Sequence, residues 1–124
     1  MSSLYARTVF FVADVQRSLE FYTKRLGFAL DWDSGDGVLQ VSLLGFELIL
    51  NETYKTALDR AGQGRVFIGL EDDQNEPLRN HIAAHTIETS RIEWGRPTLV
   101  IKDLDGNELF IWPGQTDLNA LDGR

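Results

Sequence analysis

The sequence repeats its own pattern once, and this repeat constrains the fold more than any other feature. Displacing the chain by 61 residues brings identical residues into coincidence, among them Gly45 with Gly106, Glu47 with Glu108, and Leu48 with Leu109. Each half of the chain reads as a strand, a helix and then three strands. A unit that occurs twice indicates two βαβββ modules, whose sheets can lie side by side with the helices outside and a cleft between them. The pattern therefore predicts an α+β fold in one domain spanning residues 1–124.

The first module is predicted to occupy residues 1–52. β-Branched and aromatic residues from Tyr5 to Val12 favour a strand. Asp14 is placed as a helix N-cap, and apolar residues then recur at every third or fourth position as far as Gly27, which suits a helix end. Three further strands are predicted over residues 28–32, 38–43 and 46–50.

The second module repeats this order after a change in composition. Residues 53–64 are polar and carry glycines, which is typical of a linker, and residues 65–124 then hold the second module and a C-terminal tail. Strands are predicted over residues 66–70, 86–94, 98–102 and 108–112. A helix is predicted after Asp72, with Pro77 in its first turn.

The composition excludes several classes of protein. The chain contains no cysteine, which excludes disulfides and thiolate metal ligands. Its net charge is −7 and its basic residues do not cluster, which argues against a nucleic-acid partner. No apolar run approaches the roughly 20 residues that span a bilayer, and Met1-Ser2-Ser3 leads into no signal-peptide pattern. We therefore expect a soluble, cytoplasmic protein that binds neither nucleic acid nor membrane.

Two segments of the chain resemble one known protein family. The segment from Arg7 to Phe28, with Asp14, Ser18, Phe21-Tyr22 and Leu26-Gly27-Phe28, resembles the opening module of the vicinal-oxygen-chelate superfamily. The segment Asp103-Leu104-Asp105-Gly106-Asn107-Glu108-Leu109 resembles the closing hairpin of that superfamily. Its members include glyoxalases, extradiol dioxygenases, fosfomycin-resistance enzymes and bleomycin-resistance proteins. The resemblance covers nearly the whole chain and implies paired βαβββ modules, but this one fold hosts many activities.

The resemblance also implies where a metal would bind. Enzymes of this family hold a divalent cation with four inward side chains, usually His and Glu, two from each module. Carried over residue by residue, these positions fall on Arg7, on Glu47, near Val66 with its neighbours Arg65 and Phe67, and on Phe110. Of these residues only Glu47 can ligate a metal. A two-residue shift restores Glu108 as a second carboxylate, so Glu47 and Glu108 form the metal site under an enzymatic alternative. We expect no metal and no other cofactor, as in the metal-free bleomycin-resistance branch.

The two histidines, His81 and His85, do not form a convincing metal site. Their spacing of four residues puts them on adjacent turns of one helix. The zinc-protease pattern with this spacing also needs a glutamate beside the first histidine, and Ile82 stands there instead. We therefore expect both histidines to be surface or half-buried residues of a helix outside the sheet.

Strand alternation predicts which side chains line the cleft. Arg7, Val9 and Phe11 share one face of their strand, and Glu47 and Ile49 share one face of another. The predicted ligand-binding residues are Arg7, Phe11, Trp32, Glu47, Trp94, Glu108, Phe110 and Trp112. Their rings suit an aromatic ligand, and the two glutamates suit a cationic group. Two simpler interpretations remain: the tryptophans pack in the core, and Arg7 neutralises Glu47 as a buried pair.

These residues favour a binding protein over an enzyme. We expect a glyoxalase/bleomycin-resistance-like protein that binds or sequesters an aromatic or cationic small molecule in a dimeric cleft, without metal-dependent turnover. Bleomycin-resistance proteins, which confer antibiotic resistance, are homodimers, so the resemblance implies a homodimer. One alternative is a metal-dependent lyase, isomerase or dioxygenase of the same superfamily. Another is a structural or regulatory dimer that binds no ligand.

Overall fold

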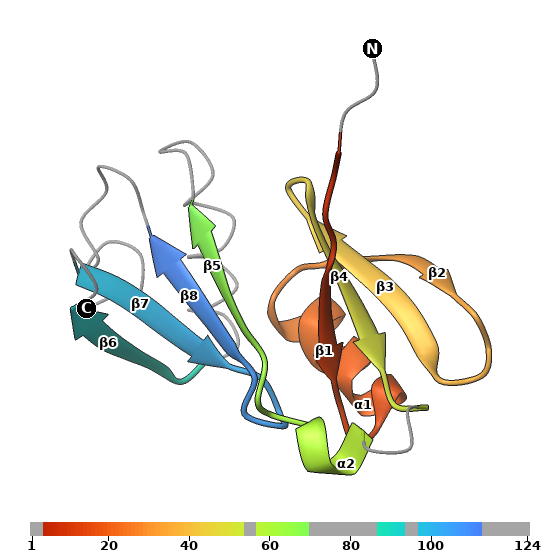
Figure 1. The fold of residues 1–124 in the computed structure, drawn as a ribbon. Coiled ribbons are helices and arrows are strands. Elements are labelled where there is room, and N and C mark those ends of the chain that lie inside the picture. The colour runs from red at the N-terminus through yellow and green to blue at the C-terminus, as the bar shows by residue number, and fades with distance from the viewer. Residues whose placement is uncertain (1–3, 54–56, 70–86, 94–96, 113–124) are drawn as a thin grey trace.

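Two four-stranded sheets form the framework of the molecule (Figure 1). The structure, a computed structural model, describes residues 4–53, 57–69, 87–93 and 97–112. In chain order its elements are β1 (Thr8–Phe11), α1 (Val15–Glu20), the π-helix η1 (Phe21–Arg25), β2 (Ala29–Asp33), β3 (Val38–Leu43), β4 (Phe46–Asn51), α2 (Ala57–Arg60), β5 (Arg65–Gly69), β6 (Thr89–Glu93), β7 (Pro97–Lys102) and β8 (Glu108–Trp112).

The two sheets have the same topology. The strand order is β1-β4-β3-β2 in the first sheet and β5-β8-β7-β6 in the second. The first strand of each module is parallel to the last, and the remaining neighbours are antiparallel. This arrangement confirms the predicted α+β fold with two similar sheets.

Most predicted strands agree with the structure, and the differences are local. β3 and β8 have the predicted bounds. β1 begins at Thr8 rather than Tyr5, because its ladder with β4 starts at the pair Thr8 and Leu48. The stretch 53–64, predicted as a linker, contains the short helix α2. The helix predicted after Asp72 lies outside the described residues.

The first helix begins and ends where the capping residues predict. The Asp14 carboxylate accepts hydrogen bonds from the backbone N–H groups of Gln16 and Arg17, each 3.1 Å long. A second carboxylate, that of Glu52, accepts one from the Val15 N–H at 3.0 Å. The chain leaves the helix at Gly27, whose φ of +85° lies in the left-handed region that favours glycine.

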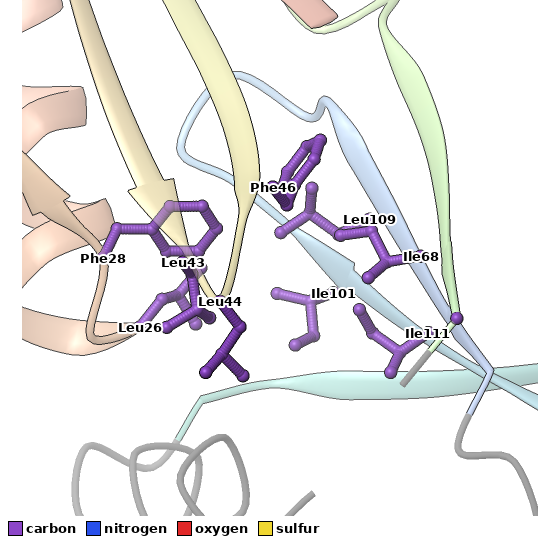
Figure 2. Close-up of a pocket in the computed structure, with 10 residues that line it drawn as sticks. Leu26, Phe28, Leu43, Leu44, Phe46, Ile68, Ile101, Leu109 and Ile111 are labelled. Carbon is purple, nitrogen blue, oxygen red and sulfur yellow. The ribbon is translucent and has the colours of Figure 1, made fainter. Parts of the chain in front are cut away.

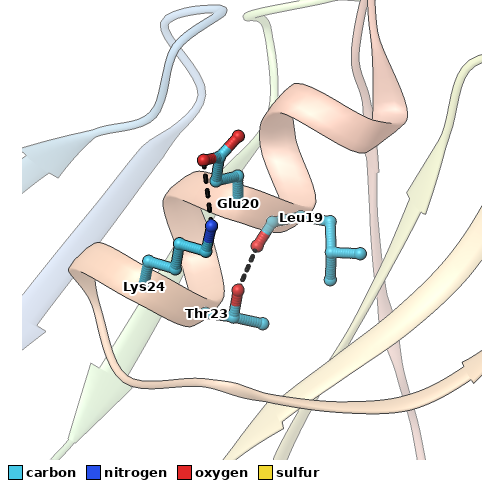
Figure 3. A network of polar contacts seen from close by, with 4 residues as sticks. All are labelled: Leu19, Glu20, Thr23 and Lys24. Atoms are coloured by element: carbon cyan, nitrogen blue, oxygen red, sulfur yellow. Dashed lines mark hydrogen bonds and ion pairs between the residues drawn. The ribbon is translucent and has the colours of Figure 1, made fainter.

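The last turn of this helix is wider than the apolar spacing predicts. In η1 the Leu26 N–H donates to the carbonyl of Phe21, five residues earlier, at 3.2 Å. On the outer surface the Thr23 hydroxyl donates to the Leu19 carbonyl at 2.7 Å, and Lys24 pairs with Glu20 at 3.1 Å (Figure 3). Both charged side chains are largely exposed, so this ion pair contributes little to stability.

One apolar core joins the helix to both sheets. The predicted helical stripe supplies Val15, Tyr22 and Leu26, which are buried, and Leu19, which packs against them. The strands, together with Val12 just after β1, supply the remaining large, fully buried side chains: Phe10, Leu39, Val41, Leu48, Leu50, Leu99, Ile101 and Leu109. The core therefore occupies the face of the first sheet that carries α1 and leaves the opposite face of that sheet available for other contacts.

The hairpin formed by residues 103–107, here called the junction hairpin, fastens the second module to the first. The Tyr22 hydroxyl donates to Asp103 Oδ2 at 3.0 Å, and the Ala13 N–H donates to Asp105 Oδ1 at 3.1 Å. Asn107 is fully buried and donates from Nδ2 to the Phe11 carbonyl at 3.2 Å. The second of the two segments that resemble the family therefore forms a structural joint between the modules.

Burial controls the protonation of the Tyr22–Asp103 pair. Desolvation raises the pKa of the Asp103 carboxyl, and hydrogen bonds from Asn107 and Tyr22 offset part of that rise. Burial also raises the pKa of Tyr22 well above its ordinary value, and the negative charge of Asp103 adds to this effect. The phenol is therefore a neutral hydrogen-bond donor at physiological pH.

Among the residues described here, no helix has both the length and the apolar character that crossing a membrane requires.

Candidate functional site

The face of the first sheet opposite α1 carries several of the predicted site residues. The parallel ladder pairs Val9 with Ile49 and Phe11 with Asn51, so these side chains share this face. Arg7 and Glu47 immediately precede the first paired residues of the same two strands and continue the row. The predicted alternation therefore holds on this face, which we call the first-sheet face.

A buried glutamine organises the polar groups of the first-sheet face. Gln40, in the middle of β3, is only 3% exposed. Its amide nitrogen donates to Asp31 Oδ2 at 2.8 Å and to Glu47 Oε2 at 2.9 Å. Its amide oxygen accepts from Arg7 Nη1 at 3.1 Å. The Ser42 hydroxyl completes the network by donating to Asp31 Oδ1 at 2.9 Å.

Arg7 does not neutralise Glu47 directly, so the interpretation of these two residues as a buried ion pair is wrong. Arg7 is exposed, and none of its nitrogens lies within 4.0 Å of a Glu47 carboxylate oxygen. The guanidinium instead lies 5.5 Å from the centre of the Tyr5 ring and donates from Nη2 to the Tyr5 hydroxyl at 3.2 Å. Gln40 stands between the two charges.

A β-bulge brings an aromatic ring to the same face. The register between β2 and β3 shifts between Leu30 and Trp32, which makes Asp31 the extra residue. The shift allows the Asp31 carboxylate to reach Gln40 while Trp32 is the register partner of Gln40. Trp32 is 38% exposed, so it is not a core residue. An indole ring, two carboxylates and a guanidinium therefore lie on one surface.

The second sheet carries a more apolar counterpart, which we call the second-sheet face. The register pairs Arg65 with Glu108 and Phe67 with Phe110. Arg65 Nε forms an ion pair with Glu108 Oε1 at 3.0 Å. A groove on this face is lined by Arg65, Val66, Phe67, Ile92, Glu93 and Phe110. The Phe67 ring also lies against Trp112, with 6.3 Å between the ring centres.

A separate cavity of about 90 Å³ lies between the modules (Figure 2). Figure 2 shows Phe28, Leu43 and Leu44 on the side of the first module, facing residues of the second sheet. The lining is apolar: Leu26, Phe28, Leu43, Leu44, Phe46, Ile68, Gly69, Ile101, Leu109 and Ile111. None of the predicted ligand-binding residues that the structure describes lines this cavity. Several of its lining residues belong to the apolar core, and none of them takes part in the hydrogen-bond network around Gln40.

The structure sorts the predicted site residues into two groups. The first-sheet face holds Arg7, Phe11, Trp32 and Glu47, and the second sheet holds Glu108, Phe110 and Trp112. Trp94, His81 and His85 lie outside the described residues.

Sequence reasoning missed the residues that join the first group, Gln40, Asp31 and Ser42. The available signal was the alternation in β3, where Gln40 and Ser42 interrupt an apolar strand at every second position.

The strand registers show which residue near Val66 occupies the carried-over metal position. Val66 pairs with Leu109 on the core side of β5, so the residue on the outer face equivalent to Arg7 is Arg65. The two modules therefore present Arg7 with Glu47 and Arg65 with Glu108. Guanidinium groups cannot ligate a metal, and Glu108 is already paired with one. Within the described ranges, no three His, Cys, Asp or Glu side chains gather as ligands, so the described residues do not supply the His and Glu set that the family resemblance implies.

Comparison with known protein families identifies the family of this chain. Residues 5–111 match the family model described as the Glyoxalase/Bleomycin resistance protein/Dioxygenase superfamily. The chain belongs to this superfamily. The match spans both modules, including the first-sheet face, the second-sheet face and the junction hairpin. A comparison with curated protein sequences finds no match.

Several solved structures share the fold at low sequence identity. The bleomycin-binding protein of Streptomyces verticillus, complexed with copper(II)-bleomycin, has a TM-score of 0.72 and 19% identity over 93% of this chain and 99% of its own. An antibiotic binding protein from Streptomyces sp. CB03234 has a TM-score of 0.63 and 22% identity over 90% and 97%. Lactoylglutathione lyase from Agrobacterium tumefaciens has a TM-score of 0.65 and 17% identity over 89% and 92%. Binding proteins and an enzyme therefore share this superfamily fold.

Proposed function

We propose that this protein binds a small molecule that carries an aromatic ring and a cationic group, without metal-dependent turnover. The observation that carries the proposal is the carboxylate of Glu47. Its Oε2 is held by Gln40, while its Oε1 accepts no hydrogen bond from the described residues. A carboxylate fixed in this way beside the exposed ring of Trp32 can pair with a cation while the indole stacks on an aromatic group.

The binding site is proposed to form between two copies of the chain. Apolar side chains on the two faces are unusually exposed: Val9 45%, Trp32 38%, Phe67 45% and Ile92 39%. A second copy related by a two-fold axis would cover these side chains and enclose a ligand at the same time. Two structures with this fold are named for binding bleomycin and an antibiotic, which supports a ligand-binding role.

The absence of metal chemistry is part of the same proposal. Arg7 and Arg65 place positive charges at the two positions where the family's enzymes carry histidine, and such charges repel a divalent cation. The alternative, a metal-dependent lyase, isomerase or dioxygenase, relies on Glu47 and Glu108 as carboxylate ligands. It would require the ion pair between Arg65 and Glu108 to open.

Titration with benzamidinium and its neutral isostere benzamide tests the proposal, with tryptophan fluorescence as the readout. We expect benzamidinium to bind more tightly than benzamide, with the same affinity before and after treatment with EDTA. Elemental analysis of the purified protein should show no stoichiometric Zn, Ni, Mn or Fe. About one such ion per chain, or binding that EDTA abolishes, would contradict the metal-free proposal.

A further inference from the structure

The two modules carry the same pair of charges in two different states. Arg7 and Glu47 occupy the positions in the first sheet that Arg65 and Glu108 occupy in the second. In the second sheet the guanidinium and the carboxylate are in contact, with 3.0 Å between Arg65 Nε and Glu108 Oε1. In the first sheet the equivalent groups are not within ion-pair distance. The second module therefore shows how the equivalent arginine and glutamate are arranged when they form an ion pair.

The position between the charges differs between the modules. Gln40 is the register partner of Ile49, and Val100 is the register partner of Phe110. Ile49 and Phe110 each follow the glutamate of their module by two residues, so Gln40 and Val100 occupy equivalent positions. Both are buried, at 3% and 3% exposure. The first module, in which the arginine and glutamate are not in contact, thus has the buried amide of Gln40 where the second module has the buried isopropyl group of Val100.

The orientation of the Gln40 amide explains how it separates the charges. Its oxygen, the negative end of the amide dipole, faces Arg7 Nη1 at 3.1 Å. Its nitrogen, the positive end, faces the carboxylates of Glu47 at 2.9 Å and Asp31 at 2.8 Å. One neutral group therefore satisfies a cation and two anions at once. A buried valine can offer none of these bonds.

We infer that Gln40 is a specificity-determining residue that holds Arg7 away from Glu47 and so keeps a carboxylate available for a cationic ligand. This inference rests on the proposed function, because it assigns the charge preference of the same site to one side chain. Gln40 acts through Glu47 and is a positioning residue. Without its amide, Arg7 closes onto Glu47 as Arg65 closes onto Glu108, and the Glu47 carboxylate is no longer available to a cationic ligand.

The test replaces Gln40 alone, because the residues opposite the two glutamates also differ, Ser42 in one sheet and Lys102 in the other. Gln40→Met removes the amide at similar volume. Gln40→Val introduces the residue found at the equivalent position of the second module. Either variant suffices if the other does not fold. Crystal structures should show an Arg7 nitrogen within about 4 Å of a Glu47 oxygen in the variant. The ratio of benzamidinium to benzamide affinity should fall by about 5-fold, the scale of one exposed ion pair.

Gln16→Met is the matched control. Gln16 is exposed and also donates to an aspartate, from Nε2 to Asp33 Oδ2 at 3.3 Å, but it lies on α1. This variant should leave both the Arg7–Glu47 distance and the affinity ratio unchanged.

The outcomes separate the inference from the proposed function. If Arg7 stays apart from Glu47 in the variants, or if the wild-type preference for the cation persists in them, the inference is overturned and the proposed function stands. If the variants close the ion pair but the wild-type protein binds neither probe, the role of the amide is supported and the proposed function fails.

Discussion

The hydroxyl of Tyr22 donates a 3.0 Å hydrogen bond to the carboxylate of Asp103, although 81 residues separate them in sequence. Both groups are buried, so neither has ready access to water as a replacement partner. Tyr22 lies in the helical segment of the first module, and Asp103 begins the junction hairpin of the second. Their bond therefore couples the stability of the two modules.

Tyr22→Phe should lower the free energy of unfolding by about 1–3 kcal/mol, because the Asp103 carboxylate loses a buried donor. Urea denaturation measures this change. Tyr5→Phe is the matched control, since Tyr5 is exposed, and it should shift the unfolding free energy by less than about 0.5 kcal/mol. Equal effects of the two substitutions would show that the Tyr22–Asp103 bond does not join the modules.

Stability should depend on pH through Asp103. Burial raises the pKa of this carboxyl in the folded protein, so the folded state takes up its proton at a higher pH than the unfolded state does. The resulting contribution to stability is fully present below the ordinary pKa of aspartate and is lost as the pH rises through the raised value. Relative to Asp103→Asn, the wild-type protein should therefore gain stability as the pH falls from neutral. Urea midpoints of both proteins across this range measure the difference, and a constant difference would contradict the prediction.

Gly64→Ala should destabilise the junction by roughly 1–3 kcal/mol, because the core around it is tightly packed. A Cβ at this position would lie 2.4 Å from Cδ1 of Phe10 and 2.9 Å from Oδ1 of Asn107. Gly69→Ala is the control, because its Cβ would meet Trp112 at an ordinary 3.6 Å. Thermal denaturation of the two variants should give a clearly lower midpoint for Gly64→Ala, and matching midpoints would contradict the packing argument.

Trp32→Ala should weaken benzamidinium binding by about 2–10-fold, the range expected for the loss of one stacking contact between aromatic rings. Because Trp32 is 38% exposed on an edge strand, the substitution should change the unfolding free energy by little. Calorimetric titration alongside urea denaturation separates the two effects. A loss of stability with unchanged affinity would assign Trp32 a packing role instead.

The chain is expected to sediment as a homodimer at micromolar concentration. A two-fold pair would cover the exposed apolar side chains on the two sheet faces. Phe67→Asp, which places a charge on the second-sheet face, should shift the equilibrium towards the monomer. A single species of 14.0 kDa for the wild-type protein would refute the proposed dimer.

Local sequence signals predicted the fold well because they act over short distances. The side chain of Asp14 caps the helix that it precedes by one residue, and alternation predicted which side chains share a face in β1 and in β4. The bonds that shape the site depend on contacts far apart in sequence. Gln40 reaches Arg7 across 33 residues, and the bulge at Asp31 changes which side chains share its face. A polar residue in an apolar strand indicates a buried hydrogen bond, but the strand pattern does not show which residue is the partner.

The junction hairpin has a consequence for the independence of the two halves. A repeat of this kind is typical of duplication, which begins with two equal copies. Here the hairpin of the second copy satisfies the Phe11 carbonyl and the Ala13 N–H of the first, while Tyr22 of the first satisfies Asp103 of the second. If the chain were cut between residues 53 and 57, each fragment would contain polar groups whose hydrogen-bond partners lie in the other fragment. The two modules are therefore complementary and not interchangeable. Each supplies hydrogen-bond partners that the other needs, so we expect neither fragment to fold without the other.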